Sequence, residues 1–237
     1  MSIKAILFDL DGTLLPMDQD TFAKAYISGL GKAAVPYGYE PKTMMNAIMA
    51  GTVAMVKNSG EKTNEGVFWD TLAGAFGESI RKDYHMYDEF YQTDFQKVKD
   101  VCGFEPRAKE IIDFVKKKGF RIVLATNPLF PSVATESRIR WADLNVEDFE
   151  CFTSYENSYH CKPNLDYYRD ILDKLALAPD ECLMVGNDVG EDMIASQLGM
   201  KVFLLTPCLI NRKNEDISAY PHGGIDELLG YIKKLTK

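Results

Sequence analysis

Residues 8–14 read Phe-Asp-Leu-Asp-Gly-Thr-Leu and directly follow the apolar run at residues 3–7, Ile-Lys-Ala-Ile-Leu. The apolar run is typical of a buried strand, and the glycine after it is typical of a turn. Asp9 and Asp11 therefore stand one residue apart where a strand ends. Two carboxylates so close are unfavourable unless a cation or a shared proton offsets them. The pattern favours a divalent metal beside a nucleophile and an acid/base, and its structural alternative is an Asp-rich turn.

Length and composition exclude several classes of protein. The 237 residues are 46% hydrophobic and 26% charged, as expected for a soluble globular protein with one large domain or two unequal ones. No apolar run approaches the roughly 18 residues of a membrane span, and the N-terminus lacks a signal-peptide pattern, so we expect a cytoplasmic protein. The net charge of −8 comes without any basic stretch, which argues against a nucleic-acid partner.

From residue 104 onward, amphipathic helices alternate with short apolar strands. The helical patterns cover residues 107–118, 165–175, 191–198 and 225–235, and the strand patterns cover residues 121–125, 182–185 and 201–205. Such alternation implies parallel strands joined by right-handed crossovers. We therefore predict an α/β fold with a doubly wound, mainly parallel, Rossmann-like sheet.

The segment between the first strand and residue 101 has a different pattern. It is rich in Ala, Met and aromatic residues, and it is helical in period at residues 21–33, 42–57, 65–75 and 83–98. Breaks such as Pro36-Tyr-Gly38 separate these stretches. We predict that residues 16–100 form an all-helical domain inserted into a core made of residues 1–15 and 101–237.

Two further motifs carry groups suited to binding an anion. Thr126 and Asn127 follow the strand at 121–125, and a threonine hydroxyl with the amides of a turn can donate to a phosphoryl oxygen. Lys162 precedes Pro163 and the helix that begins near residue 165. A lysine at a helix N-terminus is unfavourable unless something anionic accompanies it. Either motif alone is also compatible with a plain turn or a surface lysine.

The last motif is acidic and follows the strand at 182–185. Residues 186–192 read Gly-Asn-Asp-Val-Gly-Glu-Asp, so that Asp188 and Asp192 are spaced to face one site. Helix capping is the simpler explanation of such a cluster. However, carboxylates at this strand end would supply the metal ligands that the first motif requires, because Mg²⁺ prefers oxygen ligands and retains several waters.

All four motifs stand in the order found in the haloacid dehalogenase-like (HAD) superfamily, which this chain resembles over essentially its whole length. Most members of that superfamily are magnesium-dependent phosphatases. The resemblance implies a helical cap at the position of the predicted insertion. It also implies that the substrate is a small phosphorylated metabolite.

The resemblance assigns a role to each motif. Asp9 would be the nucleophile that forms an aspartyl-phosphate, and Asp11 would be the general acid/base. Mg²⁺ would be bound by the carboxylates of Asp9 and Asp188 and by the backbone carbonyl of Asp11. The remaining roles are phosphate binding by Gly12, Thr126, Asn127 and Lys162, and support of the metal site by Asn187 and Asp192.

The resemblance leaves other activities open. A phosphomutase of the β-phosphoglucomutase kind shares these motifs, and a catalytically idle binding or regulatory protein can share the fold. Dehalogenases of this type lack an acid at the position of Asp11, so its presence favours phosphoryl chemistry. The specific substrate and the oligomeric state cannot be deduced from the sequence.

One polar break in the predicted cap is a candidate for substrate contact. It lies between two predicted helices and contains the donors Lys57, Asn58, Lys62 and Asn64. A cap that closes over an open sheet edge would exclude water from the reaction. A solvent-facing connection between helices is an equally good interpretation of this segment.

Overall fold

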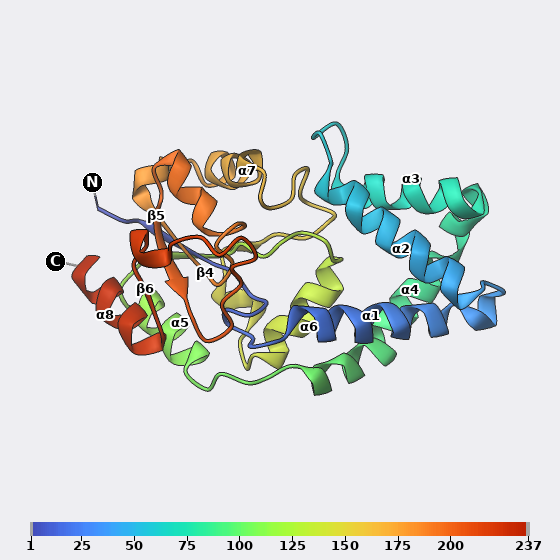
Figure 1. The fold of residues 1–237 in the computed structure, drawn as a ribbon, viewed down its shortest axis with the longest axis horizontal. Coiled ribbons are helices and arrows are strands. Elements are labelled where there is room, and N and C mark those ends of the chain that lie inside the picture. Colours follow the sequence, from blue (N-terminus) through green and yellow to red (C-terminus); the bar gives the residue numbers. More distant parts are fainter. Residues whose placement is uncertain (1, 236–237) are drawn as a thin grey trace.

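A computed structural model describes residues 2–235, and within them it contains one six-stranded parallel sheet (Figure 1). The strand order is β3-β2-β1-β4-β5-β6, so β1 is central. The strands are β1 (Ala5–Phe8), β2 (Arg121–Leu124), β3 (Cys151–Phe152), β4 (Cys182–Gly186), β5 (Lys201–Leu205) and β6 (His222–Gly223). The predicted doubly wound α/β fold is confirmed.

Helices cover both faces of this sheet. Alternate strand residues point to opposite faces, and Ile6 and Phe8 pack with α5 (Ala108–Lys117), α6 (Ser132–Trp141) and α8 (Ile225–Leu235). Ala5 and Leu7 pack instead with α7 (Leu165–Leu175) and the 3-10 helix η6 (Met193–Leu198). Two short 3-10 turns, η4 (Val146–Asp148) and η5 (Pro179–Glu181), precede β3 and β4, and η7 (Ile217–Ala219) precedes β6.

The register of the central strands brings their carboxyl ends to one edge of the sheet. Phe8 of β1 lies opposite Leu124 of β2 and Val185 of β4. The three strands are parallel, so the loops that follow them begin side by side at the carboxyl edge of the sheet. In open α/β sheets this edge is where ligands bind.

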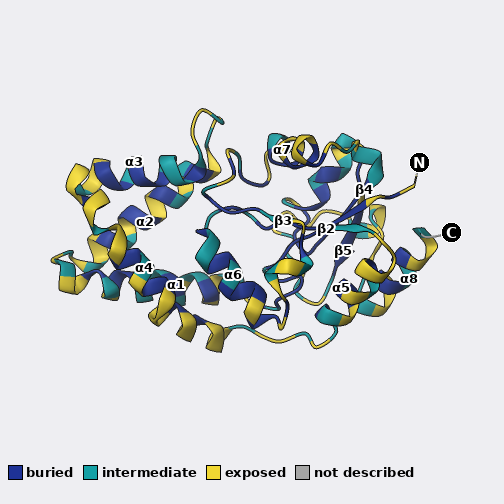
Figure 2. Cartoon of the chain, turned by 180° about the vertical axis from the view of Figure 1, so that it is seen from behind, coloured by how far each residue is buried: buried dark blue, intermediate teal, exposed yellow. Residues whose placement is uncertain are grey.

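The chain between β1 and β2 forms a separate group of helices (Figure 1). They are α1 (Gln19–Ala33), α2 (Pro41–Val56), α3 (Asn64–Phe76) and α4 (Tyr84–Gln92), with the 3-10 helices η1 (Val35–Tyr37), η2 (Glu78–Asp83) and η3 (Asp94–Val101). Their buried sides face one another, whereas their outer sides are exposed (Figure 2). The predicted helical insertion is confirmed.

The two connections between insertion and core lie side by side. Gly103 donates its backbone N–H to the Pro16 carbonyl at 2.7 Å, and Met17 and Cys102 form an antiparallel bridge. The two covalent connections of the insertion thus form one narrow neck of paired backbone.

Two predicted helices differ from the structure. The helix predicted over residues 83–98 is divided at Thr93, whose φ and ψ are −119° and −85°. There the Thr93 amide is shared between the carbonyls of Glu89 and Phe90, and the next bond, from the Gln96 amide to the Thr93 carbonyl, spans only three residues, so 3-10 bonding replaces the α-helical pattern. The helix predicted over 191–198 is a 3-10 helix that begins at Met193, and Glu191 and Asp192 stay in the preceding loop.

No helix within residues 2–235 is both long enough and apolar enough to cross a membrane.

The contact between α2 and α3 predicts opposite effects for two helical glycines. A Cβ at Gly51 would come within 2.7 Å of the Phe68 ring, whereas a Cβ at Gly74 would meet nothing within 4 Å. We expect Gly51→Ala to lower the free energy of unfolding by about 1–2 kcal/mol, because overpacking outweighs the gain in helix propensity. Gly74→Ala, the matched control, should raise it by about 0.5–1 kcal/mol. Urea unfolding measures both, and equal stability of the two variants would contradict this account of the packing.

Candidate active site

Asp9 is the first residue after β1 and is almost completely buried. Its backbone N–H donates to the Val185 carbonyl at 2.9 Å, which continues the pairing of β1 with β4. One carboxylate oxygen accepts from Lys162 Nζ at 2.9 Å and the other accepts from the Thr13 hydroxyl at 3.1 Å. Burial raises the pKa of Asp9, and the Lys162 charge opposes that rise. The carboxylate is therefore held in one position at the sheet edge by two donors.

Lys162 links two of the predicted acidic residues. Its side chain is only 1% exposed, and its Nζ lies 2.6 Å from Asp192 Oδ1 as well as 2.9 Å from Asp9. Burial disfavours the charged ammonium, but Asp192 and Asp9 together raise the pKa of Lys162 well above its ordinary value. Burial also raises the pKa of Asp192 to about 6, against the pull of Lys162. One buried cation thus serves two carboxylates, and the cluster retains an excess of acidic groups.

Asp188 is oriented by the turn after β4. Its Oδ1 accepts from the backbone N–H groups of Gly190 and Glu191 at 2.7 and 3.0 Å. Its own backbone N–H donates to Asp192 Oδ2 at 3.0 Å, so Asp192 connects Asp188 to Lys162. The remaining oxygen, Oδ2, lies 2.8 Å from Arg212 Nη1. The structure therefore brings Asp9, Asp188 and Asp192 into one connected network.

Asp11 is paired with a buried arginine on α6. Arg138 is fully buried and donates from Nη1 to Asp11 Oδ2. The guanidinium carbon lies 4.4 Å from the centre of the Phe130 ring, and Nη2 donates to the Thr135 hydroxyl at 3.2 Å. These contacts fix Arg138 and, through it, one oxygen of Asp11. The other oxygen, Oδ1, is buried and has no hydrogen-bond partner within the described chain.

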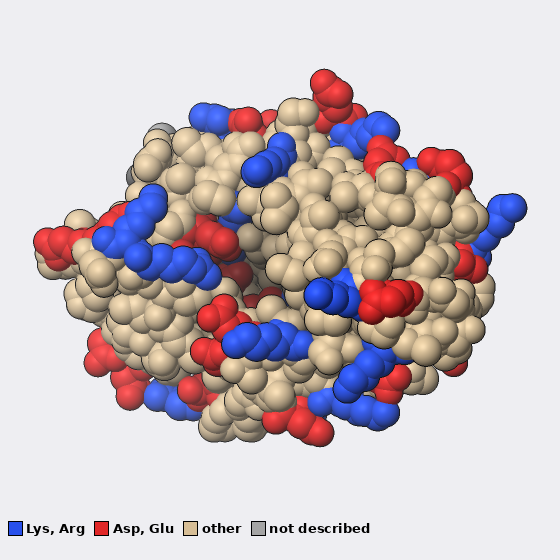
Figure 3. Space-filling model, turned by 45° about the vertical axis from the view of Figure 1, so that its right-hand side comes forward, with Lys and Arg blue, Asp and Glu red and all other residues tan. Residues whose placement is uncertain are grey.

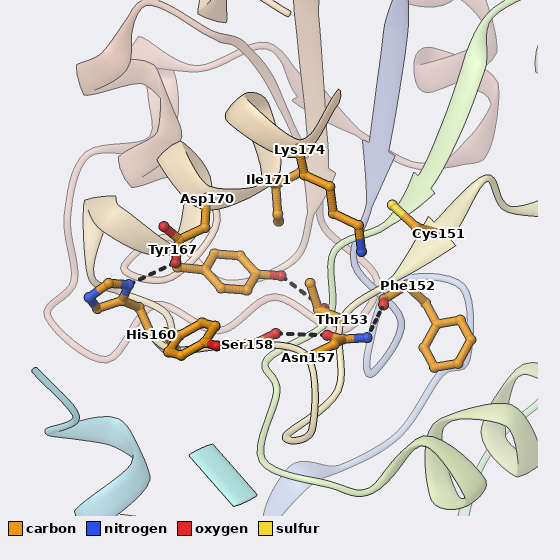
Figure 4. A pocket seen from close by; sticks show the side chains of 11 residues that line it. Cys151, Phe152, Thr153, Asn157, Ser158, His160, Tyr167, Asp170, Ile171 and Lys174 are labelled. Carbon is orange, nitrogen blue, oxygen red and sulfur yellow. Dashed lines mark hydrogen bonds and ion pairs between the residues drawn. The ribbon is translucent and has the colours of Figure 1, made fainter. Parts of the chain in front are cut away.

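The loop after β2 is anchored from behind by hydroxyl groups. The Thr126 carbonyl accepts from Thr153 at 2.6 Å and from Tyr167 at 2.9 Å. Both of these residues also line a small cavity of about 50 Å³ between β3 and α7 (Figure 4). That cavity has room for little more than a water molecule, so it serves the packing behind the site rather than a substrate.

Asn127 and Glu191 connect the second motif to the fourth. Asn127 Nδ2 donates to Glu191 Oε2 at 3.0 Å, while Asn127 Oδ1 is buried without a partner among the described residues. Burial raises the pKa of Glu191 to about 7. Unpaired buried acceptors such as Asn127 Oδ1 and Asp11 Oδ1 are costly in a folded protein. Both residues line one cavity, which makes that cavity a candidate place for a ligand.

The turn at Gly12 is packed directly against Asn187. Gly12 has a φ of +88°, and a Cβ at this position would lie 2.4 Å from Asn187 Nδ2. Asn187 Oδ1 lies 3.0 Å from the Thr13 hydroxyl oxygen and shares its single proton with Asp9, and Asn187 Nδ2 donates to the Cys208 carbonyl at 2.7 Å. Glycine is therefore required on both conformational and steric grounds. The Asn187 side chain therefore connects the turn of the first motif to the loop after β5.

The oxygen-rich donor set is compatible with Mg²⁺. Asp9 and Asp188 follow paired strands, and the backbone carbonyl of Asp11 adds a third oxygen. Asp188 Oδ2 already faces a cation, the Arg212 guanidinium, which indicates that this oxygen is placed to accept positive charge. No group of three His, Cys, Asp or Glu side chains in residues 2–235 is arranged to hold a metal. A metal here would therefore rely on two carboxylates, a carbonyl and water.

The polar cap segment contacts the core but not the cavity beside Asp11. Asn64 is fully buried, and its side chain donates to the Pro128 carbonyl at 3.3 Å and to Cys161 Sγ at 3.2 Å. Asn58 Nδ2 donates to Asn64 Oδ1 at 2.9 Å. Lys62 pairs instead with Asp70 of α3 at 2.6 Å, and Lys57 is exposed. The structure thus brings Asn58 and Asn64 together at the cap–core contact and separates the two lysines from it.

Two charged partners of the site are absent from the sequence-based prediction. Arg138 lies in a helix without an amphipathic pattern, and its partner Asp11 is 127 positions away. Arg212 lies in an irregular loop after β5. Neither residue carries a local signal of its role. Glu191, by contrast, stands inside the acidic motif at 186–192, where a carboxylate could have been singled out.

The chain is similar to known proteins of one family. A family model described as haloacid dehalogenase-like hydrolase matches residues 3–198. A phosphoglycolate phosphatase of Nitrosospira multiformis is 25% identical over 205 residues, covering 86% of this chain and 83% of the relative. One from Vibrio parahaemolyticus is 25% identical over 210 residues, with 86% and 84% covered. The crystal structure of a HAD phosphatase from Thermococcus onnurineus superposes with a TM-score of 0.59 at 16% identity, covering 97% of this chain and 98% of that one.

Proposed function

The chain belongs to the haloacid dehalogenase-like hydrolase family, and on that premise we propose that it hydrolyses small phosphomonoesters through an aspartyl-phosphate on Asp9. The observation that carries the proposal is the buried Asp9 carboxylate, held by Lys162 and Thr13 at the carboxyl edge of the sheet. Asp11, the second carboxylate of the motif, stands two residues further on beside a cavity. The relatives named phosphoglycolate phosphatase support this class of reaction.

In the first step, one oxygen of Asp9 attacks phosphorus in line with the ester oxygen. A bond forms between Asp9 and phosphorus, and the bond from phosphorus to the ester oxygen breaks. Asp11 in its protonated form gives its proton to the departing oxygen, so the product leaves as an alcohol. Arg138 acts as a positioning residue here, because its contact fixes one Asp11 oxygen.

In the second step, water attacks the same phosphorus on the opposite side from Asp9. Asp11, now a carboxylate, accepts a proton from that water. The bond between phosphorus and Asp9 breaks, which regenerates the free carboxylate and releases inorganic phosphate. The pair of displacements returns both aspartates to their starting states.

Binding of the phosphoryl group is assigned to the surrounding donors. Thr126 would supply a hydroxyl, Lys162 positive charge, and Asn127 a backbone N–H to the phosphoryl oxygens. Gly12 is the further proposed donor, although its backbone N–H donates to the Leu15 carbonyl at 2.8 Å and would have to exchange that contact for a phosphoryl oxygen. Donors fixed in advance stabilise the charge of the transition state without reorganising. Lys162 has the added role of holding Asp9, which its 2.9 Å contact supports.

Mg²⁺, when bound, would neutralise phosphoryl charge next to the nucleophile. The carboxylates of Asp9 and Asp188 and the carbonyl of Asp11 are the proposed ligands. Asp192 and Asn187 are the proposed supports, since Asp192 holds the Asp188 backbone and Asn187 holds the Thr13 turn.

The domain boundaries are proposed at residues 15–16 and 100–101, beside the neck in which Gly103 donates to the Pro16 carbonyl.

The assignment of the two early aspartates predicts different failures for their amide variants. Asp9→Asn should abolish both turnover and covalent phosphorylation, because an amide is a poor nucleophile. Asp11→Asn should lower kcat by about 10²–10⁴-fold, the usual contribution of an acid/base, and leave phosphorylated enzyme detectable with an activated ester. Steady-state kinetics and intact-protein mass spectrometry measure these effects. Near wild-type turnover of Asp9→Asn would show that the nucleophile is a different residue.

The proposed division between metal ligand and support predicts a graded loss of affinity for Mg²⁺. Asp188→Asn should weaken Mg²⁺ binding far more than Asp192→Asn, for which a loss of about 10–100-fold is typical of a supporting contact. Calorimetric titration of substrate-free protein gives both affinities, with circular dichroism as the control for folding. Equal affinities of the two variants would remove the distinction, and a normal affinity of Asp188→Asn would remove the site.

The polar cap segment gives a test of substrate selectivity. If Lys57, Asn58, Lys62 or Asn64 contributes to substrate binding, replacing each by Ala should change the ranking of phosphomonoesters by kcat/KM. Vanadate inhibition should be unchanged, because vanadate binds the core donors. Asp70→Ala is a matched control, since it removes the partner of Lys62 on α3 without altering the segment itself. Unchanged kinetics with every ester in all four variants would place the segment outside the substrate site.

A further inference from the structure

A cavity of about 200 Å³ lies next to Asp11, between the cap and the core. Most of its wall is apolar and comes from α1 and its linker and from the loop after β2. The larger of these apolar residues are Met17, Phe22, Tyr26, Ile27, Leu129 and Phe130. The proposed acid/base therefore stands at one end of a mainly hydrophobic chamber.

The aromatic side chains of this wall are packed edge to face. Tyr26 and Phe130 have ring centres 5.0 Å apart, and Phe22 and Phe130 have ring centres 5.9 Å apart. The Tyr26 hydroxyl is already paired with the Tyr91 hydroxyl at 2.8 Å. Tyr26 therefore offers its ring to the cavity rather than a free hydrogen-bonding group.

The residues that line the cavity include no cation. Its charged members are Asp11 and Glu191, and its other polar members include Thr52 of α2. Figure 3 shows a hollow in which acidic atoms gather, with basic side chains at its rim. An anionic group on a ligand would therefore find no cationic side chain among the residues that line the cavity.

The two buried cations nearest the site are already committed. Arg138 pairs with Asp11 and lies behind the Phe130 ring, and it is fully buried. Lys162 is shared between Asp9 and Asp192. Arg212 is 63% exposed, but it lines an adjoining depression and pairs with Asp188. None of the three faces the apolar chamber as a free cation.

From these observations we propose that the chamber binds the leaving group of the substrate, and that this group is an uncharged, apolar alcohol carrying a ring. The proposal rests on the proposed function, because it assigns the alcohol part of the phosphomonoester. The volume agrees with a ring, since a dry cavity of about 150 Å³ lined by apolar side chains holds benzene. The aromatic wall favours edge-to-face or offset contact with such a ring.

The same geometry disfavours phosphoglycolate, the substrate in the names of the relatives. Its leaving group carries a carboxylate, which would enter a chamber that holds two acidic residues and no cation. Desolvating that carboxylate without a partner is costly. At 25% identity, a relative can share the phosphoryl chemistry and differ in the group that its cap recognises.

The test compares benzyl phosphate with phosphoglycolate in the full chain with Mg²⁺. Both leaving groups are alkyl alcohols, so the esters differ mainly in the group that the chamber must accept. We expect kcat/KM to be higher for benzyl phosphate by about 10–100-fold, as the burial of one aromatic ring implies. A preference for phosphoglycolate, or equal values, would overturn the proposal.

A third substrate separates failure of this proposal from failure of the proposed function. Acetyl phosphate has a small, activated leaving group and therefore reports the chemistry of the core alone. Hydrolysis of acetyl phosphate without a preference for benzyl phosphate overturns the apolar chamber and leaves the phosphatase assignment intact. No hydrolysis of any of the three phosphate compounds overturns both.

A charge introduced into the chamber gives a matched pair of variants. Thr52→Lys adds a cation to the wall, whereas Val53→Lys adds the same cation at a neighbouring position of α2 that is 52% exposed. We expect Thr52→Lys to shift the kcat/KM ratio toward phosphoglycolate by at least about tenfold, while Val53→Lys keeps the wild-type ratio. Equal ratios in the two variants would show that the leaving group does not enter this chamber.

Arg212→Gln tests the remaining source of positive charge. If Arg212 receives a substrate carboxylate, its loss should selectively reduce kcat/KM for phosphoglycolate, and that result would overturn the proposal. We expect instead that the ratio of the two esters stays within about twofold of the wild-type value, because the chamber is lined by other residues.

Discussion

The arrangement of the site depends on one buried ammonium group that two carboxylates share. Lys162 lies between Asp9, which follows β1, and Asp192, which follows β4, at 2.9 and 2.6 Å. Because all three groups are buried, removal of Lys162 would leave two carboxylates without their shared cation at low dielectric. Pro163 and the side-chain cap of Asn164 set where the lysine emerges before α7. The constraint therefore joins three separate stretches of chain at the edge of the sheet.

Asp11 and Asp188, at the margins of the Lys162 cluster, are also paired with cationic side chains. Arg138 holds Asp11 from the helix after β2, and Arg212 faces Asp188 from the loop after β5. The two arginines differ in exposure, since Arg138 is fully buried and Arg212 is 63% exposed. A buried partner fixes a side chain for positioning, whereas an exposed partner is easily replaced by another cation. This difference fits a fixed acid/base at Asp11 and an exchangeable cation position at Asp188.

The sequence predicts the elements that have a strong local pattern. The apolar runs before Asp9 and Asp188 form the paired strands β1 and β4, and because these strands are parallel they end at the same edge of the sheet. The helices at 165–175 and 225–235 match α7 and α8 because each is amphipathic and clearly bounded. In contrast, β3 has only two residues, and α6 buries polar side chains such as Arg138 within an otherwise unpatterned helix. Arg138 takes its role from a contact with Asp11 that only the tertiary fold creates.

The position of the cap explains why the substrate chamber and the polar cap segment are different places. The helix α1 begins only a few residues after the Asp11 turn, so the neck places Phe22 and Tyr26 directly over the catalytic edge. The segment that ends in Asn64 returns to the core farther along, where its buried amide donates to loops that carry Pro128 and Cys161. The segment that ends in Asn64 helps to attach the cap to the core, while α1 supplies the wall that a leaving group would meet. Selectivity then depends on the short linker between β1 and α1, because it fixes how closely the aromatic wall approaches Asp11.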